Sequence, residues 1–118
     1  MITDINEYQK EALVTAEYAS EEYPFLLLTE EAGEVVGKLN KFARKNNTNT
    51  AAAVKFARHE KNSQLRKDVI KELGDASWSW VVACAELDVD PAEVFQENII
   101  KLRDRQARGV ICGSGDNR

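Results

Sequence analysis

Apolar residues recur every three or four positions in four segments of the chain, which is the period of an α-helix that buries one face. The four segments span residues 4–20, 25–44, 63–87 and 91–109. Residues that favour a helix N-terminus stand at or just before these segments: Asp4, Pro24, Ser63 and Asp90. The pattern predicts no strand and an all-α fold that resembles a four-helix bundle.

The connection over residues 45–62 is rich in Asn, Thr and charged side chains, and it can include a short helix over Ala51–Arg58. The helix that follows it carries apolar residues on a second side as well as on its core face, with Trp78 about 160° from Trp80. We therefore expect this helix to be central or to lie at a subunit contact, and we expect a homo-oligomer.

Composition adds few constraints on function. The 118 residues, 43% of them hydrophobic, suit a single domain over residues 1–118. The chain has no apolar run long enough to span a membrane and no secretory leader, so we expect no membrane partner and a cytoplasmic location. A net charge of -4 argues against a polynucleotide partner. Cys84 and Cys112 form no disulfide or metal pattern and are expected to be reduced thiols.

Two acidic pairs provide the most informative chemistry. Glu31 and Glu34 are three residues apart in one predicted helix, and Glu72 and Asp75 are three residues apart in another. Such pairs lie about 60° apart on a helix, so two packed helices can bring four carboxylates together. At about 6 Å and an effective dielectric of about 20, each pair of like charges costs about 3 kcal/mol. A solvated surface explains either pair alone, but both together favour a bound cation, and oxygen ligands favour Mg²⁺ with Mn²⁺ as a substitute.

Three glycines accompany the acids inside the same helices: Gly33, Gly37 and Gly74. Each weakens a helix interior by about 1 kcal/mol relative to alanine, so close helix packing or ligand access should explain them. The single histidine, His59, lies in the polar connection, which argues against a di-iron site. The sequence also lacks a phosphate-binding glycine loop and a nucleophile motif. Water activated by a metal remains as the nucleophile.

A stripe of side chains that donate hydrogen bonds follows on the last predicted helix. Its members lie within about 80° of one another: Asn98, Lys101, Arg105 and Arg108. The stripe suits phosphate oxygens, and an ordinary solvated face paired with Glu97 and Asp104 is the alternative. The tail over residues 109–118 either frays or closes over a nucleotide. Trp78 or Phe25 is a candidate for stacking on a base, with a place in the core as the alternative.

In this order, these elements resemble the MazG-type all-α nucleoside triphosphate pyrophosphohydrolases. The resemblance rests on three motifs: Glu30-Glu31-x-x-Glu34, Glu72-x-x-Asp75 and Asn98-x-x-Lys101-x-x-x-Arg105. The closing Arg108-Gly109 and the tail also resemble small members of the family. The 37 residues between the acidic motifs, Val35–Lys71, are more than the family pattern leads us to expect.

The resemblance implies the site and the reaction. Four carboxylates would bind Mg²⁺: Glu31, Glu34, Glu72 and Asp75. Glu30 would assist as a further ligand or orient water, and Lys101 and Arg105 would hold phosphates. The reaction would be hydrolysis of a nucleoside triphosphate to the monophosphate and pyrophosphate, with water attacking the α-phosphorus, in a dimer or tetramer.

Two alternatives remain open from the sequence. The chain can be a nucleotide-binding or regulatory helical module without turnover, if the long connection blocks the water. It can also be a helical interaction protein whose acids are simply solvated. The sequence does not decide the preferred base or sugar, the acceptance of diphosphates or the biological role.

Overall fold

The computed structural model describes residues 1–117, which form five α-helices and no strand. The helices are α1 (Ile5–Val14), α2 (Tyr23–Lys45), α3 (Thr50–His59), α4 (Gln64–Glu86) and α5 (Pro91–Ala107). The predicted all-α class is confirmed. The structure has one helix more than the four main segments because the short helix considered within residues 45–62 is present as α3.

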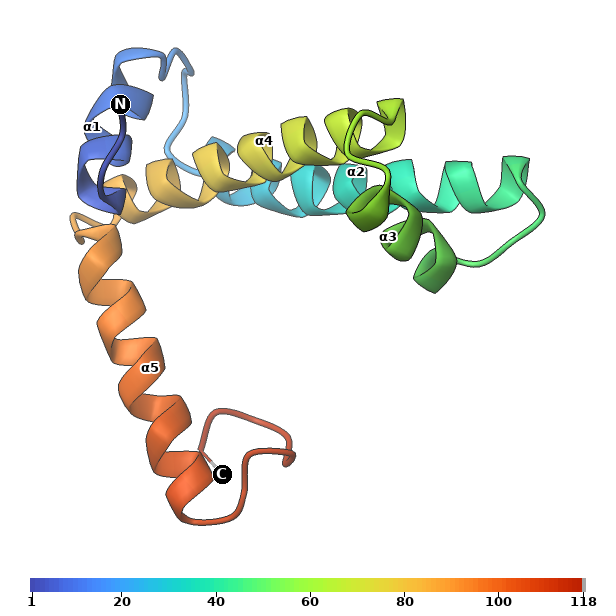
Figure 1. Cartoon of the computed structure of the whole chain (residues 1–118). Helices are drawn as coiled ribbons and strands as arrows, with labels where there is room; N and C mark the ends of the chain where they lie inside the picture. The colour runs from blue at the N-terminus through green and yellow to red at the C-terminus, as the bar shows by residue number, and fades with distance from the viewer. Residues whose placement is uncertain (118) are drawn as a thin grey trace.

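Helices α2 and α4 lie side by side and form one long arm of the molecule (Figure 1). Helix α3 packs across one end of this pair, where its small residues Ala53 and Ala57 meet Leu39 of α2 and Leu65 of α4. The rings of Phe42 and Phe56 stack beside this cluster, with centroids 4.7 Å apart. The connection over residues 45–62 therefore contains a helix packed on α2 and α4 and is not one long loop.

Helix α1 packs against the other end of α4 (Figure 1). Ala12 meets the fully buried Val81 and Val82 there, and Ile5 and Tyr8 extend the same apolar face. The buried Gln9 donates from its side-chain nitrogen Nε2 to the carbonyl oxygen of Val81 at 2.9 Å. Helix α4 thus contacts α1, α2 and α3, and it is the central helix of the chain.

The first helix is shorter than the predicted segment 4–20, because it ends at Val14. The hydroxyl of Thr15 donates to the carbonyl oxygen of Ala12 at 2.7 Å, and the same hydroxyl accepts the indole N–H of Trp78 at 2.8 Å. A side chain that hydrogen-bonds to the backbone in this way competes with helix propagation. The chain then turns toward α2 instead of continuing along α1.

Helix α5 leaves the rest of the molecule at a steep angle (Figure 1). Its first turns hold it in place: the backbone N–H of Ala92 donates to the side chain of Asn6 at 3.0 Å, and Phe95 stacks on Trp80 at 4.8 Å. The radius of gyration is 17.1 Å, whereas a compact chain of this length has about 13.5 Å. The single chain is therefore open. None of the helices described is both long and apolar enough to cross a membrane.

The contact of α2 with α3 and α4 can be tested at Leu39. Replacement of Leu39 by alanine should lower the free energy of unfolding by about 2–5 kcal/mol, because it leaves a cavity between three helices. Replacement of Val14, which is 79% exposed, by alanine should change it by less than about 0.5 kcal/mol. Urea denaturation of both variants measures the difference, and equal effects would contradict this account of the core.

Candidate metal and nucleotide site

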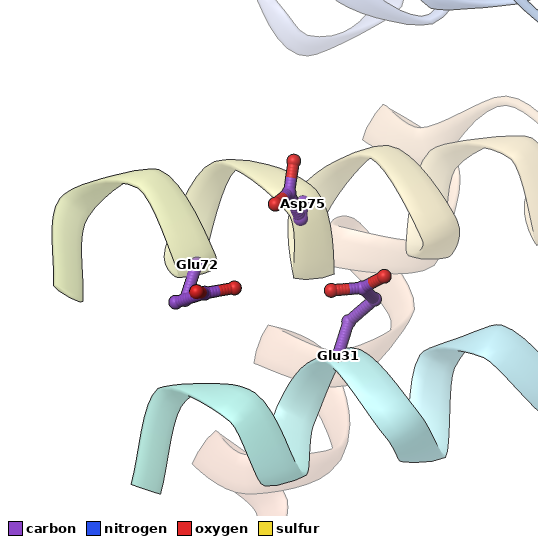
Figure 2. Close-up of side chains that lie close together, drawn as sticks. All are labelled: Glu31, Glu72 and Asp75. Carbon is purple, nitrogen blue, oxygen red and sulfur yellow. The ribbon is translucent and has the colours of Figure 1, made fainter. Parts of the chain in front are cut away.

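Three carboxylates meet at the contact between α2 and α4. Glu31 comes from α2, and Glu72 and Asp75 come from successive turns of α4 (Figure 2). One oxygen atom from each of the three lies within 4.8 Å of the other two. Glu31 and Glu72 are half-buried and Asp75 is exposed, so the cluster lies at the rim of the helix contact rather than inside the core.

The arrangement raises the pKa of Glu31 above its ordinary value. Loss of solvent is the largest cause, and the negative charges of Asp75, Glu30, Glu72 and Glu34 add to it in that order. The ionised form of Glu31 is thus disfavoured by its surroundings. A cation between these side chains would remove the repulsion, and three carboxylates are the oxygen donors that hard divalent cations prefer.

The other acids of the first motif take outer positions. Glu30 and Glu34 are both exposed and lie outside the group of three. Each is still near enough for its charge to raise the pKa of Glu31. The structure therefore brings together three of the four predicted metal ligands and leaves Glu34 at the edge.

Lys38 is a residue of the site that sequence reasoning missed. Its ammonium nitrogen lies 3.6 Å from the carboxylate of Glu72. The spacing in the sequence could have identified it. Lys38 follows Glu31 by seven residues and therefore lies about 20° from it around the helix. The ammonium group of Lys38 thus faces the cluster from α2. There it can contact the negative charge of a ligand that binds at the site.

The glycines near the acids are not required by helix packing. A Cβ atom added at Gly33, Gly37 or Gly74 would meet no other heavy atom within 4 Å. Close helix packing, one of the two explanations left open by the sequence, therefore does not account for these glycines within the single chain. Open space beside them leaves ligand access, or contact with a second molecule, as the reason for glycine.

The predicted basic stripe on α5 does not reach the acidic cluster within one chain, because α5 extends away from α2 and α4 (Figure 1). Two of its cations, Lys101 and Arg105, are held by the tail instead. Asp116 accepts from Lys101 at 3.2 Å and from the buried Arg105 at 2.9 Å, and these contacts hold the pKa of Asp116 below its ordinary value. Arg108 forms an ion pair with Asp104 at 2.8 Å, and Asn98 is exposed.

Trp78 has a structural contact. Its indole N–H donates to Thr15 at the end of α1, and its ring packs against the cluster around Val81 and Val82. This geometry supports the alternative of a place in the core. The other candidate for stacking, Phe25, is 41% exposed near the start of α2.

Comparisons with known proteins agree with this geometry. The family model of the MazG nucleotide pyrophosphohydrolase domain matches residues 14–110, which include α2, α3, α4 and α5. The chain is 38% identical over 97 residues to the Gene 37 protein of Mycobacterium phage L5, and the match covers 81% of this chain and 75% of that protein. No solved structure matches the chain significantly. The chain belongs to the MazG nucleotide pyrophosphohydrolase family.

Proposed function

We propose that this protein is a Mg²⁺-dependent hydrolase that converts nucleoside triphosphates into the monophosphate and pyrophosphate. Membership of the MazG family implies a nucleotide substrate and a metal-dependent reaction. The observation that carries the finer proposal is the convergence of Glu31, Glu72 and Asp75 beside Lys38. Carboxylates that bind a divalent cation next to an ammonium group suit a triphosphate, because its phosphate charge is neutralised by the metal ion and by the ammonium group together.

The donor set fits Mg²⁺ or, as a substitute, Mn²⁺. Glu31, Glu72 and Asp75 would hold the cation, and Glu34 is near enough to the cluster to join them. When bound, the cation supplies neutralisation of phosphate charge and a lowered pKa for water. The acids in turn hold the cation at the rim of the helix contact, where a triphosphate has access from solvent.

Glu30 and Lys38 have separate roles in the proposal. Glu30 orients the attacking water and accepts its proton. The new bond joins the water oxygen to the α-phosphorus, and the bond that breaks joins this phosphorus to the oxygen bridging to the β-phosphorus. Lys38 would hold an oxygen of the leaving pyrophosphate, because its ammonium group already lies against the cluster.

The phosphate contacts expected from α5 require a second copy of the chain. Apolar side chains are exposed along the helices of the open molecule: Leu26, Ile70, Leu73, Phe95, Ile99 and Ile100. A dimer or tetramer would cover such side chains and could bring the Asn98, Lys101, Arg105 and Arg108 stripe of one copy toward the acids of another. Separation of the stripe from the acids within one chain supports this assembly.

The reaction is tested by product analysis. Pure protein with deoxynucleoside triphosphates and Mg²⁺ should release pyrophosphate and not orthophosphate. Replacement of Glu72 by Gln or of Asp75 by Asn should lower kcat/KM by about 100-fold or more, the scale of losing one electrostatic group at a reacting centre. Glu60→Gln, an exposed change after α3, should leave the rate intact. Release of orthophosphate alone would refute the proposed bond cleavage.

Loss of solvent and like-charge repulsion at Glu31 predict that replacing this carboxylate stabilises the protein in a pH-dependent way. Because its pKa is raised in the folded chain, ionisation of Glu31 opposes folding, and this penalty grows as pH rises through the folded-state pKa. Glu31→Gln should therefore raise the melting temperature of the metal-free protein at pH 7 but not at about pH 3, below the ordinary range for Glu.

The same variant should lose most of the stabilisation that the parent protein gains from millimolar Mg²⁺. Glu21→Gln, a change at an exposed position before α2, is the matched control and should show neither effect. Calorimetric melting with and without Mg²⁺ measures both quantities. Full Mg²⁺ stabilisation in Glu31→Gln would remove this residue from the proposed ligands.

The assembly is tested by mass in solution. The parent protein should sediment as a dimer or tetramer, and Ile70→Glu should shift it toward the monomer, because a charge buried in an apolar interface is strongly unfavourable. Val14→Glu, at the highly exposed end of α1, is the control and should leave the mass in solution unchanged. A parent protein that stays monomeric at micromolar concentration would end this part of the proposal.

A further inference from the structure

Charge is divided unevenly along the chain. Residues 38–71 contain ten Lys or Arg and two acids, a net charge of +8, whereas the rest of the chain holds the other six Lys or Arg and eighteen acids, a net charge of -12. The flanking stretches 11–37 and 72–100 contain seven acids each and no Lys or Arg. The overall charge of -4, from which no polynucleotide partner is expected, thus averages over blocks of opposite sign. Such asymmetry is typical of chains that bind nucleic acid or a membrane surface.

The fold gathers the basic segment at one end of the molecule. The segment comprises the second half of α2, all of α3 and the first turns of α4, and α3 packs across the other two helices there (Figure 1). Eight of its ten cationic side chains are exposed, and the other two, Lys38 and Arg66, are half-buried. None of the eight forms an ion pair within residues 1–117. These eight side chains, called the basic end below, therefore present charge that no acid of the same chain neutralises.

A groove of about 210 Å³ runs between α2 and α4 at the basic end. Its lining comprises Lys38, Lys41, Phe42, Lys45, Leu65 and Asp68. The three lysines lie within about 60° of one another around α2 and span about 10 Å along its axis. That length matches about three phosphates of a nucleic-acid strand at a spacing of about 3.4 Å. Asp68 is the one acid in the lining, and its carboxylate accepts from the side chain of Gln64 at 2.7 Å.

An aromatic surface continues from the groove onto α3. Phe42 lines the groove, and its ring stacks on the ring of Phe56 with centroids 4.7 Å apart. Phe56 is 39% exposed, and its neighbours Lys55 and Arg58 on α3 are exposed. Proteins that bind single strands combine a cationic groove for the phosphates with aromatic rings on which the bases stack. An acidic protein surface would use the cations but would have no base to place on the ring.

We infer that the basic end binds single-stranded nucleic acid, with phosphates along the lysines of the groove and a base stacked on Phe56. Binding of this kind tolerates any sequence, because every base has a flat face and every nucleotide carries a phosphate. The surface is separate from the carboxylate cluster, since Lys45 lies 14 residues after Glu31, about 21 Å along α2. Strand binding therefore requires neither the metal nor the proposed reaction.

The test measures binding of a labelled poly-dT strand to the intact protein by fluorescence anisotropy, in EDTA so that neither metal nor turnover contributes. The parent protein should bind at low salt. A plot of the logarithm of its association constant against the logarithm of salt concentration should have a slope of about -0.7 for each phosphate contact. Lys41→Gln/Lys45→Gln removes two contacts, so its slope should be shallower by about 1.4 and its affinity at low salt should fall by about tenfold or more.

The matched control is Lys10→Gln/Arg103→Gln, which removes the same charge at exposed positions of α1 and α5 and should bind as the parent does. Phe56→Leu should lower the affinity by about tenfold and leave the slope unchanged, because base stacking releases no counterions. Melting temperatures show whether each variant is folded.

Four results would overturn the inference. They are no binding of the strand by the parent protein at low salt, equal losses in the groove and control variants, an unchanged slope in Lys41→Gln/Lys45→Gln, and equally tight binding of polyglutamate or of anionic vesicles. Sedimentation adds a further test, because a shift of Lys41→Gln/Lys45→Gln toward the monomer would make the basic end a contact between copies of the chain instead.

Discussion

The packing of α2 against α4 holds together charges that repel one another, and the candidate site depends on this constraint. Leu39 and Leu65 fix the pair at one end, where α3 covers them, and Val81 and Val82 fix α4 against α1 at the other. Between these two apolar clusters, carboxylate oxygen atoms of Glu31, Glu72 and Asp75 lie within 4.8 Å of one another, and their negative charges repel. Stability from the two ends thus offsets electrostatic strain in the middle, a common arrangement at functional sites.

A position at the rim of the helix contact suits carboxylates that are to bind a cation. Carboxylates buried in the core would bind a proton instead of a metal, because desolvation disfavours their ionised form. At the rim, the pKa of Glu31 is raised, but Asp75 stays in solvent and Lys38 approaches Glu72. The site therefore keeps negative charge available while remaining open to a large, highly charged ligand.

Local signals in the sequence predicted much of this molecule. The helical period and the caps at Ser63 and Asp90 gave α4 and α5 close to their observed bounds, and the spacing of acids predicted which faces of α2 and α4 meet. The end of α1 at Val14 was not predicted: Thr15 turns its hydroxyl back to the carbonyl oxygen of Ala12, and the same hydroxyl accepts from Trp78, which is distant in sequence. The direction of α5 and the groove beside Lys41 also follow from tertiary contacts that no periodicity encodes.

The ion pair between Arg105 and Asp116 has a practical consequence for handling the protein. The guanidinium of Arg105 is only 4% exposed, and within residues 1–117 its Nε atom has no hydrogen-bond partner, so the tail supplies most of its compensation. Proteolytic trimming before Asp116, or a shortened gene, would remove both oxygen atoms that accept hydrogen bonds from this guanidinium. A preparation that is meant to keep the native end of α5 should therefore retain the chain through Asp116, which also binds Lys101.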